Sequence, residues 1–182
     1  MFISPRFLMV FALGATFMWS GSAGAQTFSP ASNQSFTFDL DTGDEHFSNW
    51  NDDDLGSISG LKATMEVDRL GKGSRWLPTF LIAVTTKEGS FGLKLLAEQW
   101  KPPIAAYTIV QSKNANALGQ QIAVGEKIDL EMDWSIPGKL IFHIDDGKSV
   151  ELGLPGPVTG IRISASTGEL KVSSLALGHF TH

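Results

Sequence analysis

The sequence contains no cysteine, one tyrosine and only 18% charged residues among its 182 positions. The absence of cysteine excludes disulfide bonds, thiolate metal ligands, thiol nucleophiles and lipid attachment through an N-terminal cysteine. Basic residues are also scarce, because 14 Lys and Arg stand against 19 Asp and Glu and give a formal net charge of -5. This acidic balance argues against a nucleic-acid-binding protein, since binding to phosphates needs a basic surface.

Long hydrophobic runs are missing as well, apart from one near the N-terminus. Phe7–Trp19 is apolar but falls short of the roughly 20 residues that cross a bilayer. It follows Arg6 and precedes small residues, among which Ala23–Ala25 fits the Ala-x-Ala pattern of a signal-peptidase site. The sequence therefore predicts a signal peptide over residues 1–25 and a mature chain that starts at Gln26. We expect a periplasmic or secreted protein with no transmembrane segment after cleavage.

What the sequence does contain is apolar–polar alternation with a period of two, which is typical of half-buried β-strands. Residues 26–34 are polar and rich in turn formers, and predict a loose leader before a single domain over 35–182. No stretch of a dozen residues combines a helical period with helix caps, so an all-β sandwich or barrel is expected. The strands are expected at 36–40, 61–67, 78–86, 91–98, 128–134, 139–144, 149–154, 160–166 and 169–177.

Two segments carry a resemblance to a known superfamily. Residues 124–147 hold a strand that ends in Trp134, a Pro137-Gly138 turn and a strand that ends in the Asp146-Gly147 turn, and residues 160–178 follow with the closing strands. This order is similar to the closing half of a concanavalin A-like (laminin-G-like) jelly-roll. The resemblance implies an antiparallel jelly-roll sandwich of two sheets. It implies no single function, because this architecture carries lectins, glucanases, lyases and adhesion modules.

Two acid-containing strands are candidates for catalysis. Laminarinase-type members of the resembled superfamily carry Glu-x-Asp-x-Glu on one strand, where one carboxylate attacks the anomeric carbon and another protonates the leaving oxygen. Asp129, Glu131 and Asp133 share one strand face with the Asp and Glu identities exchanged, and Glu66 and Asp68 begin the pattern without completing it. A solvated strand face explains both better, so we expect no catalysis from them.

The acidic segment that spans residues 39–54 is a candidate calcium site. Its carboxylates are hard oxygen ligands of the kind that Ca²⁺ prefers, and many jelly-rolls of the resembled type hold a structural Ca²⁺. The spacing matches no fixed calcium-loop motif, so a solvated loop is the alternative and no other cofactor is expected. The candidate ligands are Asp39, Asp41, Asp44, Asp52 and Asp54.

Aromatic residues supply the candidate ligand-binding positions, because sugar rings stack their C–H faces on flat apolar side chains. Trp76 and Trp100 lie beside prolines at expected strand ends, and Tyr107 opens the next strand. The alternative for both tryptophans is half-buried packing at a strand end. Trp134 is in phase with the apolar positions of its strand, so we expect it in the core.

Other catalytic or metal-binding motifs are missing. His46 and His143 show no metal-ligand spacing, and His179 and His182 lie at a terminus expected to fray. The sequence has no Gly-x-Ser-x-Gly elbow and no Gly-rich phosphate loop. The hypothesis is therefore a non-catalytic, exported β-sandwich that binds a glycan or another extracellular ligand. The alternatives are a small glycan-active hydrolase or lyase of the same fold, and a structural or adhesion module with a protein partner. The sequence leaves the ligand and the oligomeric state open.

Overall fold

The protein is described from a computed structural model that covers residues 26–32, 35–72, 76–98, 104–111, 114–145 and 149–182. At Glu98 and in β7 and β8, up to residue 120, the description is of the backbone alone. The described ranges form thirteen strands and no helix. No helical segment able to cross a membrane occurs in this part of the chain.

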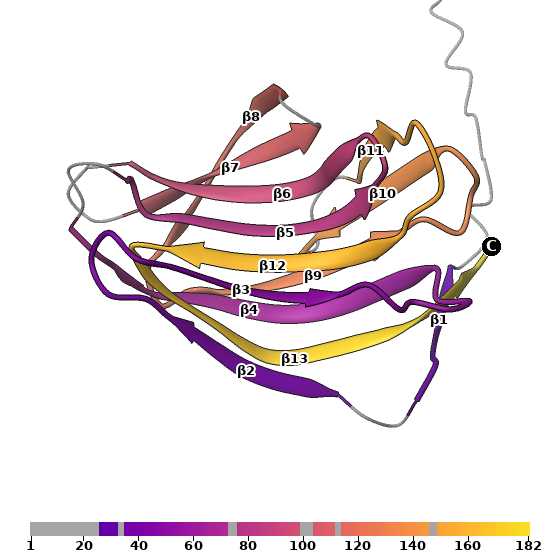
Figure 1. Ribbon diagram of the computed structural model, residues 1–182, viewed down its shortest axis with the longest axis horizontal. Coiled ribbons are helices and arrows are strands. Elements are labelled where there is room, and N and C mark those ends of the chain that lie inside the picture. The colour runs from indigo at the N-terminus through magenta and orange to yellow at the C-terminus, as the bar shows by residue number, and fades with distance from the viewer. Residues whose placement is uncertain (1–25, 33–34, 73–75, 99–103, 112–113, 146–148) are drawn as a thin grey trace, which may run out of the picture.

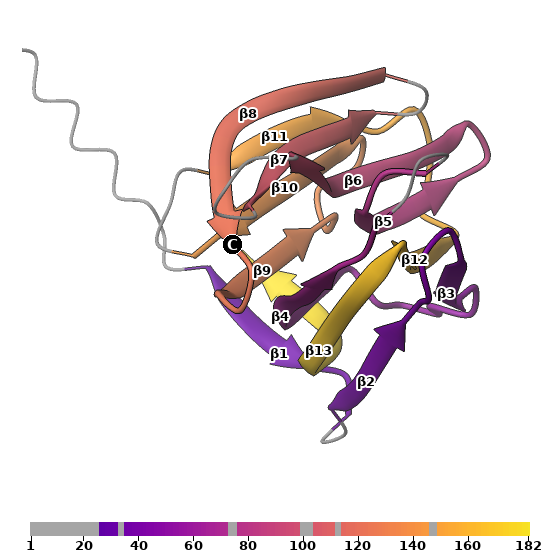
Figure 2. The same cartoon turned by 90° about the vertical axis from the view of Figure 1, so that its left-hand side faces the viewer.

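The strands form two antiparallel sheets that lie against each other as two layers (Figures 1 and 2). Sheet A has the order β1-β13-β4-β9-β10-β11, with β2 also paired to β13, and sheet B has the order β3-β12-β5-β6-β7-β8. The strands of sheet A are β1 Thr27–Pro30, β2 Phe36–Asp41, β4 Gly60–Leu70, β9 Lys127–Asp133, β10 Lys139–Ile144, β11 Val150–Gly153 and β13 Gly168–Thr181. Those of sheet B are β3 Phe47–Asp52, β5 Thr79–Thr86, β6 Gly89–Glu98, β7 Ile104–Gln111, β8 Asn114–Ala123 and β12 Gly160–Ser166.

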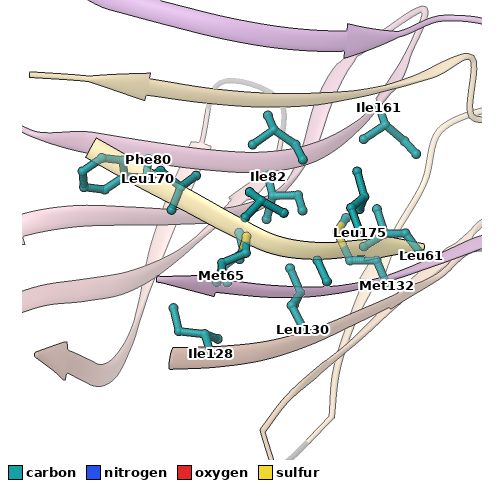
Figure 3. Packing of buried hydrophobic residues seen from close by; sticks show 14 of the residues in the cluster. Leu61, Met65, Phe80, Ile82, Ile128, Leu130, Met132, Ile161, Leu170 and Leu175 are labelled. Carbon is teal, nitrogen blue, oxygen red and sulfur yellow. The ribbon is translucent and has the colours of Figure 1, made fainter. Parts of the chain in front are cut away.

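The core lies between the inner faces of the two sheets. Every second residue of the central strands is apolar and buried, as the alternation predicts. Figure 3 shows side chains of β4 and β9 in sheet A meeting those of β5 and β12 in sheet B. The largest fully buried side chains are Phe80, Phe142, Leu61, Met65, Leu93, Ile128, Leu130, Met132, Leu140, Ile161 and Ile163.

The longest strand, β13, is central to sheet A. It pairs along its length with β4 on one side, and its other side is shared by β2 and β1. The chain enters it from sheet B through Thr167, whose φ of 55° is unusual for a β-branched residue. Thr42 fixes this turn, because its hydroxyl accepts from Gly168 N at 2.9 Å and donates to Gly168 O at 2.8 Å. One residue thus carries the chain from one layer to the other.

Three strands, β1, β3 and β8, occupy segments that the sequence did not predict as strands. Within residues 26–34, expected as a leader, Thr27–Pro30 form β1 and pair with Gly178–Thr181. Within the acidic segment, expected as a loop, Phe47–Asp52 form β3, the edge strand of sheet B. Trp50 of β3 stacks on Phe38 of β2 with ring centroids 5.4 Å apart. This contact joins the edges of the two sheets and explains why so polar a segment is ordered as a strand.

The stability of the fold should depend on the buried layer and little on exposed leucines. Leu130→Ala removes a side chain that is 1% exposed, and should lower the free energy of unfolding by about 2–5 kcal/mol. The matched control is Leu77→Ala, at a side chain that is 45% exposed, which should change it by within about 0.5 kcal/mol. Urea unfolding of both variants measures the difference, and equal losses would contradict the sandwich core.

Candidate functional site

Two of the three aromatic residues expected to bind ligand, Trp76 and Tyr107, lie in or next to strands of sheet B. Trp76 is 44% exposed and lies just before β5, so it is at the end of sheet B where β5 begins. Tyr107 is on β7, where the register places it opposite Leu95 of β6. Trp100 lies outside the described residues. The structure therefore describes one exposed tryptophan at this end of sheet B.

Strand register defines the outer face of sheet B, because residues directly paired across antiparallel strands lie on the same face. We use this name for the described outward positions of β3, β12, β5 and β6. Along one cross-strand row, Asn51 pairs with Arg162 and Arg162 with Ala83. The members are Phe47, Asn49, Asn51, Arg162, Ser164, Ser166, Thr79, Leu81, Ala83, Thr85, Ser90, Gly92, Lys94 and Leu96.

Arg162 extends along this face. Its guanidinium carbon lies 5.7 Å from the ring centroid of Phe47, which pairs with Ser166 two outward positions further along the sheet. The Arg162 side chain therefore passes Ser164, which is only 6% exposed despite its outward position. The Arg162 Nε atom is buried and has no hydrogen-bond partner among the described residues. Stacking on Phe47 stabilises the charge, but this N–H donor is left without an acceptor.

The ionisable side chains that the structure describes on this face are both cationic. Arg162 and Lys94 are its only ionisable side chains among the described positions. Glu98 follows Leu96 by two residues at the end of β6, where the backbone alone is described. The remaining outward positions of the face carry neutral side chains, including the exposed amides of Asn49 and Asn51 on β3. The described side chains of this face therefore carry two positive charges, while the register places Glu98 at the next outward position of β6.

Four of the five carboxylates considered for catalysis, all except Asp133, lie together on the opposite surface, the outer face of sheet A. Asp133 is 1% exposed and accepts hydrogen bonds from Gln26 and the Ser135 backbone N–H. Each of the other four meets a cationic or hydroxyl partner on a neighbouring strand or segment. Lys62 Nζ donates to Glu131, Thr64 Oγ1 donates to Asp129 at 2.6 Å, and Lys171 Nζ donates to Asp68 at 2.7 Å. Glu66 pairs in register with Lys127 and Lys171. A depression of about 210 Å³ between β4 and β9 is lined by the first two pairs.

The pKa shifts on this face follow from the same pairing. The hydrogen bond from Lys171 holds the pKa of Asp68 below its usual range, and the same bond raises the pKa of Lys171. Partial burial raises the pKa of Glu169, which lies 3.3 Å from the same ammonium. A glycosidase acid needs a carboxyl kept protonated near neutral pH beside an ionised one. The pKa values of Asp68 and Glu169 are shifted apart in this way, but the Lys171 ammonium lies against both carboxylates, which favours a structural role.

The acids proposed to bind calcium are distributed over several contacts. Asp41 accepts from Arg69 at 2.8 Å, Asp44 accepts from the Lys72 backbone N–H at 2.8 Å, and Asp52 accepts from the Asp54 backbone N–H at 3.1 Å. Asp39 pairs in register with Lys171. In the described ranges, no group of three acidic or histidine side chains could hold a metal ion. Calcium binding by this segment stays a prediction.

Trp134 is only partly in the core, in contrast to the expectation from its phase. It packs against the apolar cluster, but it also lines a groove of about 600 Å³ at the end of the sandwich near the C-terminus. We call this the Trp134 groove. It is lined by Ile58, Ser59, Trp134, Ser135, Pro137, Gly138, Leu154, Pro155, Gly156, Pro157 and Val158.

A Ser, His and Asp group lies beside this groove, although the histidines gave no signal in the sequence. The C-terminal segment does not fray, because β13 extends to Thr181 and is paired with β1. His182 Nε2 lies 3.0 Å from Asp133 Oδ2 and 3.1 Å from Ser135 Oγ. A catalytic triad uses the two ring nitrogens separately, one for the carboxylate and one for the nucleophile. Both contacts here end on the same nitrogen, and Asp133 is also bound by Gln26 Nε2 at 2.6 Å. The group therefore lacks the geometry of a catalytic triad and instead connects both ends of the domain to the end of β9.

The residues that sequence reasoning missed are Arg162 and the loops of the Trp134 groove. Alternation in 160–166 does predict an outward Arg162, but nothing in the sequence places Phe47 beneath its guanidinium. The prolines of 136–138 and 154–158 predict turns, and only the fold brings these turns together around Trp134.

The chain was compared with known proteins. No family model and no curated protein matches the sequence. Among solved structures, an alginate lyase from Corynebacterium sp. superposes with a TM-score of 0.54 at 6% identity, over 74% of this chain and 62% of that one. The alginate lyase AlgAT5 of polysaccharide lyase family 7 gives a TM-score of 0.52 at 8% identity, over 74% and 63%.

A carbohydrate-binding module, CBM66 from Bacillus subtilis, gives a TM-score of 0.48 at 9% identity, over 84% of this chain and 94% of that one. The chain spans just under two thirds of the length of both lyases. At these identities the similarity concerns the arrangement of strands alone. Together with the two antiparallel sheets, it shows that this chain has the concanavalin A-like jelly-roll sandwich fold.

Proposed function

We propose that this chain is an exported, non-catalytic β-sandwich that binds an acidic polysaccharide on the outer face of sheet B. The observation that carries the proposal is Arg162, whose buried Nε–H donor has no acceptor among the described residues while its guanidinium stacks on Phe47. Buried polar groups are almost always hydrogen-bonded, so an unpaired donor calls for an explanation. Because Nε itself is buried, a ligand carboxylate would form a charge-assisted pair with the accessible part of the guanidinium, since Arg162 as a whole is only partly buried.

The surroundings of Arg162 support a glycan carboxylate in particular. Lys94 adds a second positive charge, and the amides of Asn49 and Asn51 can both donate to and accept from sugar hydroxyls. Phe47, which is 48% exposed, offers a flat apolar surface to the C–H groups of a sugar ring. Trp76 extends the aromatic surface at the end of the sheet where Phe47 also lies.

The comparisons agree with this class of ligand. Two solved structures with TM-scores above 0.5 are named as alginate lyases, and alginate is a polymer of uronic acids. A ligand of the same charge would suit a face that carries Arg162 and Lys94. The similarity itself concerns the fold, so the ligand class is proposed from the residues of this chain.

Binding without turnover is proposed because Lys94 is the only described side chain on the outer face of sheet B that could transfer a proton, and no second such group is described beside it. General acid–base catalysis needs a His, carboxyl, Tyr, Cys or similar group within hydrogen-bond reach of the reacting atom. Apart from Lys94, the described side chains of this face include none of these. The carboxylates of the chain that do gather on one surface lie on sheet A, where Lys62 and Lys171 pair with them.

The charge of Arg162 should dominate the affinity for acidic glycans. Arg162→Gln should weaken binding of oligoalginate about tenfold or more, because hydrogen bonds to charged groups contribute about 1.5–3 kcal/mol. The matched control is Arg69→Gln on the outer face of sheet A, which removes the same charge and should change affinity by less than about twofold. Isothermal titration of the three proteins makes the comparison. Equal losses in both variants would mean that net charge alone attracts the polymer.

Trp76 should contribute to binding if it extends the aromatic surface. Trp76→Ala should then weaken oligoalginate binding by about 1 kcal/mol, a factor of about five, without lowering the melting temperature. Leu77→Ala, at the neighbouring exposed position, serves as the control and should leave the affinity unchanged. Unchanged affinity in Trp76→Ala would limit the site to the strands of sheet B.

The acids of sheet A should be dispensable for both binding and chemistry. Glu131→Gln and Glu66→Gln should leave oligoalginate affinity unchanged, since both side chains lie on the opposite surface from Arg162. The wild-type protein should release neither reducing ends from β-glucan nor unsaturated sugars from alginate. Steady product release that either substitution abolishes would replace the binding function with the glycan-active enzyme.

A further inference from the structure

The Trp134 groove lies at the opposite end of the sandwich from Trp76. The strand β12 begins at Gly160, directly after the groove residue Val158, and ends at Ser166, which pairs with Thr79 near Trp76. The groove is formed where the loops 53–59, 134–138 and 154–159 meet, at the right-hand end of Figure 1. It is therefore separate from the outer face of sheet B.

The three loops hold one another in place. Trp134 Nε1 donates to Ile58 O at 3.1 Å, and the Trp134 backbone N–H donates to Ser59 O at 2.9 Å. Leu154 N donates to Gly138 O at 2.8 Å, which ties the second loop to the third. Pro137, Pro155 and Pro157 fix the φ angle of their positions. The groove is thus formed before any ligand arrives, which reduces the entropic cost of binding.

The chemistry of the lining is neutral. None of its eleven residues carries a charge, and most are apolar. Its volume of about 600 Å³ is within the range of about 300–1,000 Å³ that is common for small-ligand sites. Because the indole N–H is occupied by the Ile58 carbonyl, Trp134 offers a ligand the face of its ring. Ser59 and Ser135 add hydroxyl groups, which can both donate and accept.

We propose that the Trp134 groove is a second binding site, for one or two neutral sugar rings of a glycan. A sugar ring presents an apolar C–H face to the indole and hydroxyls to the serines and loop carbonyls, which matches this lining. A proline-rich peptide fits less well. Its free backbone carbonyls need N–H or O–H donors from aromatic residues, and the one indole N–H of the groove already has an acceptor.

A substitution at Gly156 can test this proposal without disturbing the core. Gly156 lines the groove, and a Cβ atom built there meets nothing within 4 Å. Gly156→Phe should therefore fill the groove. The matched control is Gly153→Phe, at an exposed glycine of β11 with equally open space that is not among the residues lining the groove. Trp134→Leu, which removes the ring face and keeps an apolar side chain, is the second variant.

Titration of cellohexaose, laminarihexaose and mannohexaose, followed by ligand-observed NMR, is the measurement. At least one should bind the wild type, and Gly156→Phe and Trp134→Leu should each weaken it at least tenfold, with Gly153→Phe unchanged. Arg162→Gln should leave this binding intact while it weakens oligoalginate binding, so the two sites fail independently. Absence of binding by all three oligosaccharides would overturn the proposal. So would a decaproline peptide that binds the wild type and is blocked in Gly156→Phe.

Discussion

The whole molecule depends on one constraint, which is that alternate residues of nearly every central strand must be buried between the two sheets. Leu61, Met65, Leu130 and Met132 meet this constraint in sheet A, and Ile82 and Ile163 meet it in sheet B. Without disulfide bonds, this apolar layer is the main source of stability available to the fold. Since it uses one face of each sheet completely, the remaining two faces are free to differ in chemistry.

The outer faces of the two sheets differ in how their charged side chains are paired. On sheet A, lysines and carboxylates alternate across strands, so that Lys62, Lys171 and their acidic partners satisfy one another. A surface of this kind offers little to a charged ligand, because binding would first have to break existing pairs. On sheet B, Arg162 has an aromatic support but lacks an acceptor for its Nε–H. The difference lies in pairing rather than in the number of charged residues.

Sequence alternation predicted the fold class and most of sheet A, including the turn at Pro137-Gly138 and the closing strands. It could do so because a strand with one buried face and one solvated face has a period of two. It failed for β3, in which four of the six residues are polar, because that strand is ordered by the stacking of Trp50 on Phe38, 12 positions earlier in the chain. It also assigned Trp134 wholly to the core. Phase shows toward which sheet face a residue points, but not whether the loops beyond the strand leave part of it open.

Candidate site residues were harder to predict than strands, because their roles depend on contacts between residues that are distant in the sequence. Arg162 is recognisable as an outward residue, but its significance comes from Phe47, 115 positions away in sequence and brought near by the pairing of β3 with β12. In the sequence, the carboxylates of β4 and β9 suggested an acidic surface. In the structure, Glu131 of β9 is paired with Lys62 of β4, and Asp68 of β4 is paired with Lys171 of β13. Such partnerships arise from register between distant strands, which a local pattern does not contain.

The position of β13 in the chain has a consequence for how the protein folds. This strand is the last of the thirteen, yet it separates β4 from both β1 and β2 in sheet A. Until residues 168–181 are available, β1 and β2 have no partner in the sheet and one edge of β4 is open. Contacts such as that of Thr42 with Gly168, 126 positions apart, add a large loop-closure cost before any stabilisation is gained. We therefore expect the domain to acquire its native structure only after β13 has been synthesised, and to fold slowly for its size.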